Sequence, residues 1–455
     1  MGILDQKNEE QGDRGSDRMT FAWAGWADSL SDEETAIVET RVSKVVGLLV
    51  ESGSLKVPLG SRLSIETSRG DRLPVECVGF SESGLYLMPY GQLDGIAKGD
   101  RVIYESSQQT VLVSEDLLGC VLNGAGEVID KSCHQGTTAM PLYRESPDAL
   151  SRKNVKTPFH TGIKAWDSFL TMGLGQRMGI FAGTGVGKSV LLGMIARESS
   201  ADVNVLALVG ERGHEVREFI DNVLGVEGMK RTVIVVSTSD QSPLMRIRAP
   251  FVAKAIAEFF ASKGKDVLYM MDSVTRMAMA MRELGLSIGE PPTAKGYPPS
   301  VFATMPKLLE RAGRFETGSI TSIISVLLEG DDIQDPIGDA VRGILDGHVV
   351  LDRNLANLGH YPAIEVTESI SRWMLDLSDD ELKELSIKGR RILTDFKNAE
   401  DLINVGAYVK GSNPEIDEAI SLRPSLMDFL KQNIQEHVEP SVQREGLKAA
   451  LGVDV

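Results

Sequence analysis

The residues best suited to chemistry lie together in one short stretch, 183–189, which reads Gly-Thr-Gly-Val-Gly-Lys-Ser. Glycines in such a loop let successive backbone N–H groups turn onto phosphate oxygens. The ammonium of Lys188 can reach the β- and γ-phosphates, and the hydroxyl of Ser189 can bind Mg²⁺. The residues expected to hold a nucleoside triphosphate here are Gly183, Thr184, Gly185, Val186, Gly187, Lys188, Ser189 and Val190.

The elements beside this stretch are those needed to position it. An apolar run at 178–182 predicts a strand, and 190–196 predicts a helix. Strand, glycine loop, Lys-Ser and helix together form a P-loop, in which the helix N-terminus adds partial positive charge. The pattern G-x-x-x-x-G-K-[ST] differs only at Ala182, where a small residue suffices. The alternative, a glycine turn with a chance Lys-Ser, does not explain the flanking strand and helix.

Two acidic residues follow predicted strands and could act on a bound nucleotide. Asp272 ends the apolar run 266–272, where an aspartate can order the Mg²⁺ shell. Glu211 follows the strand 203–209 and could polarise the water that attacks the γ-phosphate. A surface ion pair with Arg212 or a neighbouring arginine is the alternative for Glu211.

Composition limits the classes of protein that fit this chain. With 455 residues, two or three domains are expected. The net charge of −17 argues against nucleic acid as the main partner. The chain shows no apolar run of about 20 residues and no signal-peptide pattern, so a cytoplasmic protein is expected, with peripheral membrane association left open. Cys77, Cys120 and Cys133 show no metal-type spacing, which favours free thiols in a reducing compartment.

The chain divides into four regions that differ in composition and in predicted secondary structure. Residues 1–18 are polar and predict disorder, whereas Trp23, Trp26 and Leu30 share one face of a predicted helix. This helix could dock on a partner or pack on the first domain. The predicted regions are the N-terminal segment 1–40, a β-barrel at 41–115, an α/β domain at 116–375 and an α-helical domain at 376–455.

Strand and helix patterns underlie this division. Six short strands between 42 and 113, separated by Gly, Ser, Asp and Pro, predict a small closed barrel. Alternating strands and helices from 162 to 372 predict a mainly parallel sheet covered on both faces. The expected strands of this sheet are 178–182, 203–209, 232–237, 266–272, 320–328 and 348–351. The helices expected after Trp373 are 379–396, 399–405, 414–421 and 425–435.

These segments make the chain resemble the catalytic ATPases of type III protein export, especially the flagellar branch, and the catalytic subunits of F- and V-type rotary ATPases. The resemblance spans about 41–421, and 410–420 is similar to the flagellar branch. Its motifs lie at 182–189, 210–213, 271–276, 289–292, 296–302, 309–313, 329–332, 335–337, 344–348 and 369–372.

The resemblance implies an N-terminal β-barrel, a central RecA-like α/β P-loop domain and a C-terminal α-helical domain, closed into a homohexamer that hydrolyses ATP with Mg²⁺. It implies that Lys188 and Ser189 bind phosphate and Mg²⁺, that Asp272 supports the metal and that Glu211 positions the water. Non-catalytic F-type subunits carry glutamine in place of this glutamate, which favours an active site here.

The resemblance also implies roles for three arginines and one aromatic residue. Arg212 and Arg276 would support the γ-phosphate, and Tyr361 would stack on adenine. Arg372 would be an arginine finger donated by the neighbouring subunit, although sequence physics alone describes it as an ordinary surface arginine.

Several partners and alternatives follow from the resemblance. It implies a stator-like regulator at the N-terminus, a coiled-coil stalk protein at the C-terminal domain, and the export gate with chaperone–cargo complexes at the inner membrane. The first alternative is the same enzyme in a virulence injectisome. A RecA-like RNA motor and a binding protein that has lost hydrolysis are the others, and the net charge weighs against the RNA motor.

Overall fold

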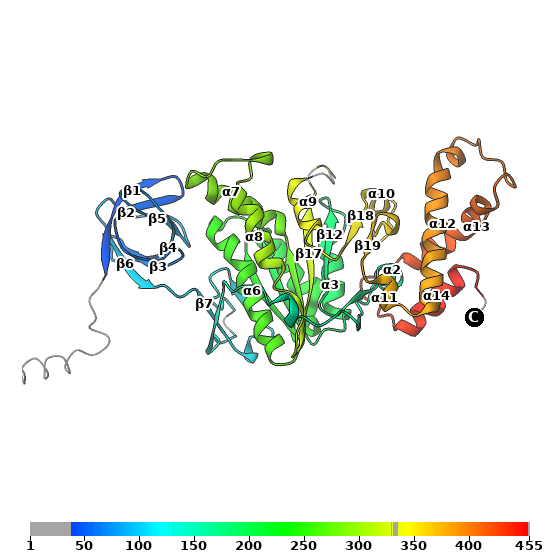
Figure 1. Ribbon diagram of the computed structural model, residues 1–455, viewed down its shortest axis with the longest axis horizontal. Coiled ribbons are helices and arrows are strands. Elements are labelled where there is room, and N and C mark those ends of the chain that lie inside the picture. Colours follow the sequence, from blue (N-terminus) through cyan, green and yellow to red (C-terminus); the bar gives the residue numbers. More distant parts are fainter. Residues whose placement is uncertain (1–37, 131, 329, 331–334, 454–455) are drawn as a thin grey trace, which may run out of the picture.

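The computed structural model describes residues 38–130, 132–328, 330 and 335–453. A barrel, a central sheet with its helices and a helical region follow one another along its long axis (Figure 1). The predicted helix with Trp23, Trp26 and Leu30 lies outside the described residues, as does most of the motif at 329–332.

Six antiparallel strands form the N-terminal barrel, in the closed order β1-β2-β5-β4-β3-β6. Alternating valine and leucine residues of these strands fill its interior, including Val50, Leu63 and Leu87. The bounds are β1 Glu39–Val46, β2 Leu49–Gly53, β3 Arg62–Glu66, β4 Arg72–Phe80, β5 Gly84–Pro89 and β6 Arg101–Ser106. The expected barrel is confirmed, but the strand predicted at 110–113 is not part of it. That strand is β7 (Thr110–Val113), which pairs with β9 (Thr138–Pro141) because the chain leaves the barrel after Ser106.

The central domain is built on a nine-stranded sheet of order β19-β18-β12-β17-β15-β13-β14-β8, with the short β16 paired to β17. Strands β8, β14, β13, β15, β17, β12 and β18 run parallel to their neighbours in this order. The bounds are β8 Val121–Asn123, β12 Arg177–Ala182, β13 Val203–Val209, β14 Thr232–Ser237, β15 Asp266–Asp272, β16 Gly313–Arg314, β17 Ser319–Leu327, β18 Gly347–Leu351 and β19 Ile370–Ser371. All six predicted strands are present, and β8 extends the edge.

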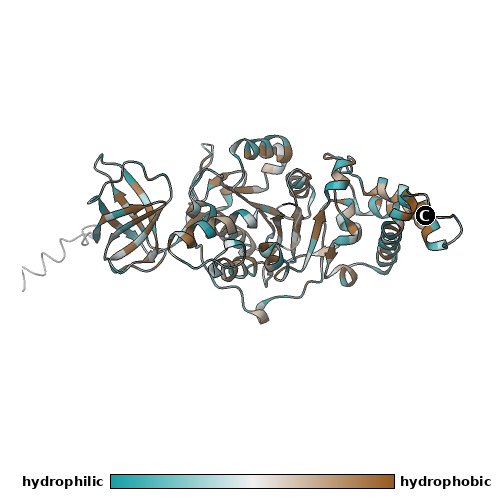
Figure 2. Ribbon diagram, turned by 90° about the horizontal axis from the view of Figure 1, so that it is seen from above, coloured by the Kyte–Doolittle hydropathy of each residue, from teal (hydrophilic) through white to brown (hydrophobic). Residues whose placement is uncertain are grey.

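Helices cover both faces of this sheet. Apolar residues of α6, α7 and α8 pack on one face, and those of α2, α3 and the C-terminal helices belong to the core of the other. Figure 2 shows the apolar residues along the strands of the barrel and the sheet. Helix bounds are α2 Lys164–Phe169, α3 Lys188–Glu198, α4 Gly213–Glu218, α5 Gly225–Met229, α6 Pro243–Ser262, α7 Val274–Ser287, α8 Pro299–Leu309, α9 Pro336–Arg342, α10 Arg353–Asn357 and α11 Met374–Leu377. A further two-stranded sheet joins β10 (Pro158–Phe159) and β11 (Met172–Gly173).

The C-terminal region is helical, as predicted, but with fewer breaks. Two predicted helices are fused in α12 (Asp380–Asn404), within which the Thr394 hydroxyl donates to the Arg390 carbonyl at 2.8 Å. Two others are fused in α13 (Pro414–Leu430), which continues through Pro424 but ends at Leu430, so that the prediction of helix to 435 is wrong. A further helix, α14 (Pro440–Ala450), was not predicted.

A buried polar contact joins the barrel to the central domain. Arg248 of α6 donates to Glu76 of β4 at 2.8 Å, and both side chains are less than a tenth exposed. The Tyr90 hydroxyl donates to the same Glu76 oxygen at 2.8 Å, and the Arg248 guanidinium lies 5.2 Å from the Tyr90 ring centroid. Since a buried charge without a partner is costly, these three side chains fix one domain on the other.

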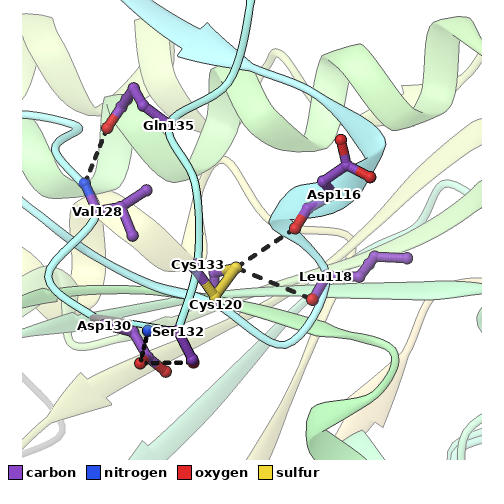
Figure 3. Close-up of a disulfide and its surroundings, with 8 residues drawn as sticks. All are labelled: Asp116, Leu118, Cys120, Val128, Asp130, Ser132, Cys133 and Gln135. Atoms are coloured by element: carbon purple, nitrogen blue, oxygen red, sulfur yellow. Dashed lines mark hydrogen bonds between the residues drawn. A yellow bond between two sulfur atoms is a disulfide. The ribbon is translucent and has the colours of Figure 1, made fainter.

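A disulfide shows that the prediction of free thiols is wrong for two of the three cysteines (Figure 3). Cys120 and Cys133, expected as free thiols, are bonded to each other, with Cα atoms 5.9 Å apart, and only Cys77 is a free cysteine of the described residues. The chain reverses after β8, so that Val128 pairs with Leu122 and brings Cys133 back to Cys120. A spacing of 13 residues carries no signal of this reversal.

None of the described helices is long and apolar enough to cross a membrane.

Candidate functional site

The loop predicted to bind phosphate lies between β12 and α3. Gly185 and Gly187 adopt φ values of +78° and +89°, which only glycine reaches without strain. Gly187 caps α3, whose first residues are Lys188 and Ser189. The predicted order of strand, glycine loop and helix is therefore present, with backbone N–H groups at the N-terminus of an 11-residue helix.

A cavity of about 220 Å³ opens beside this loop. It brings Ser189 together with Glu211 and Asp272, the two acidic residues predicted from the strand ends. The remaining lining residues are Val190, Leu208, Glu215, Val216, Glu218, Phe219 and Val223. The hydroxyl and carboxylate oxygens of these three side chains suit a cation and a polarised water.

Lys188 is held by the carboxylate at the end of β15. Its Nζ donates to Asp272 Oδ1 at 2.5 Å and lies 4.0 Å from Glu211 Oε1. The Ser325 hydroxyl of β17 donates to the same Oδ1 at 2.7 Å. Asp272 is 2% exposed, so its charge is stabilised by these two donors rather than by water.

Glu211 directly follows Gly210, which comes after β13 (Val203–Val209). Burial raises the pKa of Glu211 to about 7, and the negative charge of Asp272 adds to this effect, while Lys188 opposes it. Glu215 of α4, a neighbour in the same cavity, also raises the pKa of Glu211. A carboxylate with a pKa near neutrality is suited to accept a proton from water at physiological pH.

The two arginines expected at the γ-phosphate are placed differently. The Arg276 side chain packs against Gly210, where an added Cβ would lie 2.9 Å from it. Its Nε is buried and makes no hydrogen bond to the part of the chain that the structure describes. Arg212 is 72% exposed and lies 3.6 Å from Glu215, outside the cavity lining. Arg276 is therefore next to the loop that carries Glu211, whereas Arg212 faces solvent.

A second cavity, of about 690 Å³, also borders the glycine loop. The Tyr361 ring forms one wall and is 45% exposed, and it would lie 3.3 Å from a Cβ placed on Gly187. The end of α13 and the residues that follow it form another wall. The lining residues are Gly185, Gly187, Val190, Leu191, Met194, Gly359, Tyr361, Pro362, Asp428, Lys431, Gln432, Asn433 and Ile434. An aromatic ring in the wall of a cavity with both apolar and polar lining residues is suited to stack on a nucleobase.

Arg372 lies at the opposite end of the sheet from this loop. Its N–H donates to the Asp346 carbonyl at 3.0 Å, and the Asp346 N–H donates to the Arg177 carbonyl at 2.9 Å. Arg177 begins β12, and the glycine loop follows its last residue, Ala182. Five residues of strand span about 16 Å. Arg372 therefore belongs to a different surface from the phosphate loop of its own chain, and it is exposed there.

The sequence did not point to Ser325, Glu215 or the segment 428–434. Ser325 is one serine within an apolar strand, and only the sheet order places it beside Asp272. Glu215 lies four residues after Glu211, and the turn into α4 brings it to the cavity. The segment 428–434 is far from the loop in sequence, and no local pattern indicates that it returns to it.

Two family profiles match the chain. The profile described as ATP synthase alpha/beta family, nucleotide-binding domain, matches residues 162–371. The profile described as T3SS EscN ATPase C-terminal domain matches residues 378–449. The glycine loop, Glu211, Asp272 and Tyr361 lie in the first match, and the segment 428–434 lies in the second.

Relatives and solved structures agree with these profiles. The flagellum-specific ATP synthase of Bacillus subtilis (strain 168) is 48% identical over 412 residues, 90% of this chain and 93% of the relative. The type 3 secretion system ATPase of Xanthomonas euvesicatoria is 46% identical, over 86% of this chain and 89% of its own length. The assembled ATPase EscN from the type III secretion system of enteropathogenic E. coli superposes with a TM-score of 0.86 at 41% identity, covering 90% of this chain and all of EscN.

The nucleotide-binding profile, these identities over most of the chain and the cavity beside the glycine loop lead to one conclusion. The chain is an ATPase that belongs to the ATP synthase alpha/beta family, in the branch of the flagellum-specific ATP synthases and the type III secretion system ATPases.

Proposed function

We propose that the chain hydrolyses ATP as a homohexameric ring and that hydrolysis energises type III export of flagellar proteins. The observation that carries this proposal is the cavity in which Ser189, Glu211 and Asp272 meet, with Lys188 at its edge. In this proposal the backbone of 183–190 and the Lys188 ammonium hold the phosphates, and Tyr361 stacks on adenine.

Glu211 is the proposed general base. Its carboxylate lies at the cavity within reach of a water beside the γ-phosphate, and its pKa of about 7 lets it take a proton at neutral pH. Arg276 approaches from Gly210 to support the γ-phosphate, and Arg212 does so after turning from its exposed position.

The residues of the cavity fit Mg²⁺ bound together with the nucleotide. The Ser189 hydroxyl and the Asp272 carboxylate supply hard oxygen ligands, directly or through water. When bound, the cation neutralises charge on the β- and γ-phosphate oxygens.

The position of Arg372 supports a site shared between two subunits. In its own chain its backbone is about 16 Å along the strands from the glycine loop, which favours a role at a neighbour's nucleotide. The relative EscN is described as an assembled ATPase, and also in complex with its central stalk EscO. We extend both features to this chain, with a coiled-coil stalk protein at the C-terminal helices.

Export of flagellar proteins is preferred over a virulence injectisome because flagellum-specific relatives reach 48% identity over 90% of the chain. The injectisome stays the second candidate, since a secretion-system ATPase is 46% identical. Deleting the gene separates the two: loss of filaments with intact effector secretion supports the flagellar role, and the reverse result contradicts it.

The remaining partners are part of the same proposal. The N-terminal segment would bind a stator-like regulator, and the ring would meet chaperone–cargo complexes at the export gate. The enzyme would then be cytoplasmic and peripherally associated with the inner membrane.

The hydrolytic role is tested by Glu211→Gln, with Glu218→Gln as a control that removes another carboxylate from the cavity lining. Loss of a general base lowers turnover by about 10²–10⁴-fold. ATP binding should persist in the Glu211 variant, and the control should retain turnover. Equal turnover of wild type and Glu211→Gln would remove Glu211 from this role.

A further inference from the structure

The serine at position 325 stands out in the core of the central domain. It lies in β17, between the glycine-loop strand β12 and the Asp272 strand β15. Ser325 is fully buried, and its strand neighbours Ile324 and Val326 are buried apolar residues. A buried hydroxyl is costly unless it is hydrogen-bonded, so its partner matters.

That partner is the carboxylate of Asp272. Ser325 Oγ donates to Asp272 Oδ1 at 2.7 Å, and Lys188 Nζ donates to the same oxygen at 2.5 Å. The other oxygen, Oδ2, accepts no hydrogen bond from the residues that the structure describes. Asp272 therefore has one oxygen that carries both donors, and its side chain lines the cavity beside Ser189.

When nucleotide binds, Lys188 moves away from Asp272 and Ser325 stays beside it. Lys188 must turn toward the phosphates and leave Asp272. Ser325 cannot follow, because its hydroxyl is fixed to a central strand of the sheet. After Lys188 leaves, Ser325 is the remaining donor to Oδ1 among the described residues.

We propose that Ser325 is a positioning residue that holds Asp272 in place while Lys188 moves to the nucleotide, so that Oδ2 is presented to the hydration shell of Mg²⁺. This inference rests on the proposed role of Asp272 at the metal. Ser325 itself does not contact the nucleotide. Its hydrogen bond selects one orientation of a carboxylate that could otherwise rotate once the lysine has gone.

The test compares Ser325→Ala with Ser325→Thr, which keeps the hydroxyl, and with Asp272→Asn, which tests the role of Asp272 at the metal. Ser322→Ala is the matched control, because it also removes a buried serine hydroxyl from β17. The Oγ atom of Ser322 lies 3.4 Å from Lys254 Nζ and not beside Asp272. The affinity for a fluorescent ATP analogue is measured in EDTA and again across a Mg²⁺ titration. Turnover is measured across the same titration, and a thermal unfolding curve checks each variant's fold.

Ser325→Ala should bind the analogue in EDTA like the wild type, because the glycine loop and Lys188 are unchanged. The Mg²⁺ concentration that gives half-maximal affinity and turnover should rise about 10- to 100-fold, as for other residues that orient a metal ligand. Ser325→Thr and Ser322→Ala should keep the wild-type Mg²⁺ dependence.

Three results would overturn the inference. Wild-type Mg²⁺ dependence in Ser325→Ala, while Asp272→Asn has lost it, removes Ser325 from this role and leaves Asp272 in its own. An equal loss in Ser325→Ala and Ser322→Ala shows a general packing effect. Wild-type Mg²⁺ dependence in Asp272→Asn contradicts the proposed function on which the inference rests.

Discussion

The protonation of Glu211 gives the most specific prediction. Burial and the charge of Asp272 raise the pKa of this carboxyl to about 7 in the nucleotide-free protein. Only the deprotonated form accepts a proton from water, so kcat/KM for ATP should rise with pH through this value. The perturbation is a change of pH from 6 to 8, applied to the wild type and to Glu211→Gln.

The magnitude follows from the two protonation states. With a pKa of about 7, the reactive fraction is about 9% at pH 6 and about 91% at pH 8, a rise of about tenfold. A glutamate with an ordinary pKa near 4.5 would change by only about 3% over the same range. The two cases differ enough for a steady-state assay.

ATP also ionises in this range, and the variant corrects for that. The ratio of kcat/KM between wild type and Glu211→Gln removes every ionisation that both proteins share. This ratio should rise about tenfold between pH 6 and 8. Glu215→Gln should move the rise to lower pH, because Glu215 contributes to the raised pKa of Glu211. A ratio that does not change with pH would refute the assignment of Glu211 as the titrating base.

Three further outcomes are expected. Arg248→Ala should lower the free energy of unfolding by about 3–5 kcal/mol, because it leaves the buried Glu76 carboxylate without its cationic partner. The double variant Arg248→Ala with Glu76→Gln should recover part of this loss. Denaturant unfolding measures the stability of both variants. Burial and the charges of Lys431 and Arg423 lower the pKa of His360 to about 4. The unfolded chain therefore binds a proton more readily, so the contribution of neutral His360 to the free energy of unfolding is complete above pH 6.5 and is lost as the pH falls toward 4. Unfolding at pH 7.5 and 5 should show about 2 kcal/mol less stability at the lower pH, and His360→Gln should show a smaller difference; equal differences would contradict it. Tyr361→Ala should bind an ATP analogue more weakly than Tyr361→Phe, which keeps the ring, as a binding titration would measure. Equal affinities of the two variants would remove the ring from base stacking.

The local parts of the site could be predicted from the sequence. The glycine loop, Glu211 and Asp272 lie within or directly after short apolar strands, and parallel strands bring such ends to one edge of a sheet. The same reasoning predicted the six strands of the central sheet. It worked because hydrophobic runs and glycine positions are local signals.

The parts that depend on chain reversal could not be predicted. Ser325 is beside Asp272 only because β17 is inserted between β12 and β15. Cys133 meets Cys120 only after the turn that pairs Val128 with Leu122. The strand at 110–113 has a barrel-like pattern, yet it pairs outside the barrel with β9, since strand propensity does not choose a partner.

The central claim is that each site is completed by Arg372 of a neighbouring subunit. It is tested most directly by mixing Glu211→Gln with Arg372→Ala, each nearly inactive alone, and measuring ATP turnover after exchange of subunits. In an equal, random mixture about a quarter of the interfaces pair an intact Glu211 with an intact Arg372 from the adjacent subunit. The account predicts that turnover recovers to about this fraction of the wild type. A mixture that stays as inactive as its two components would contradict a site shared between subunits.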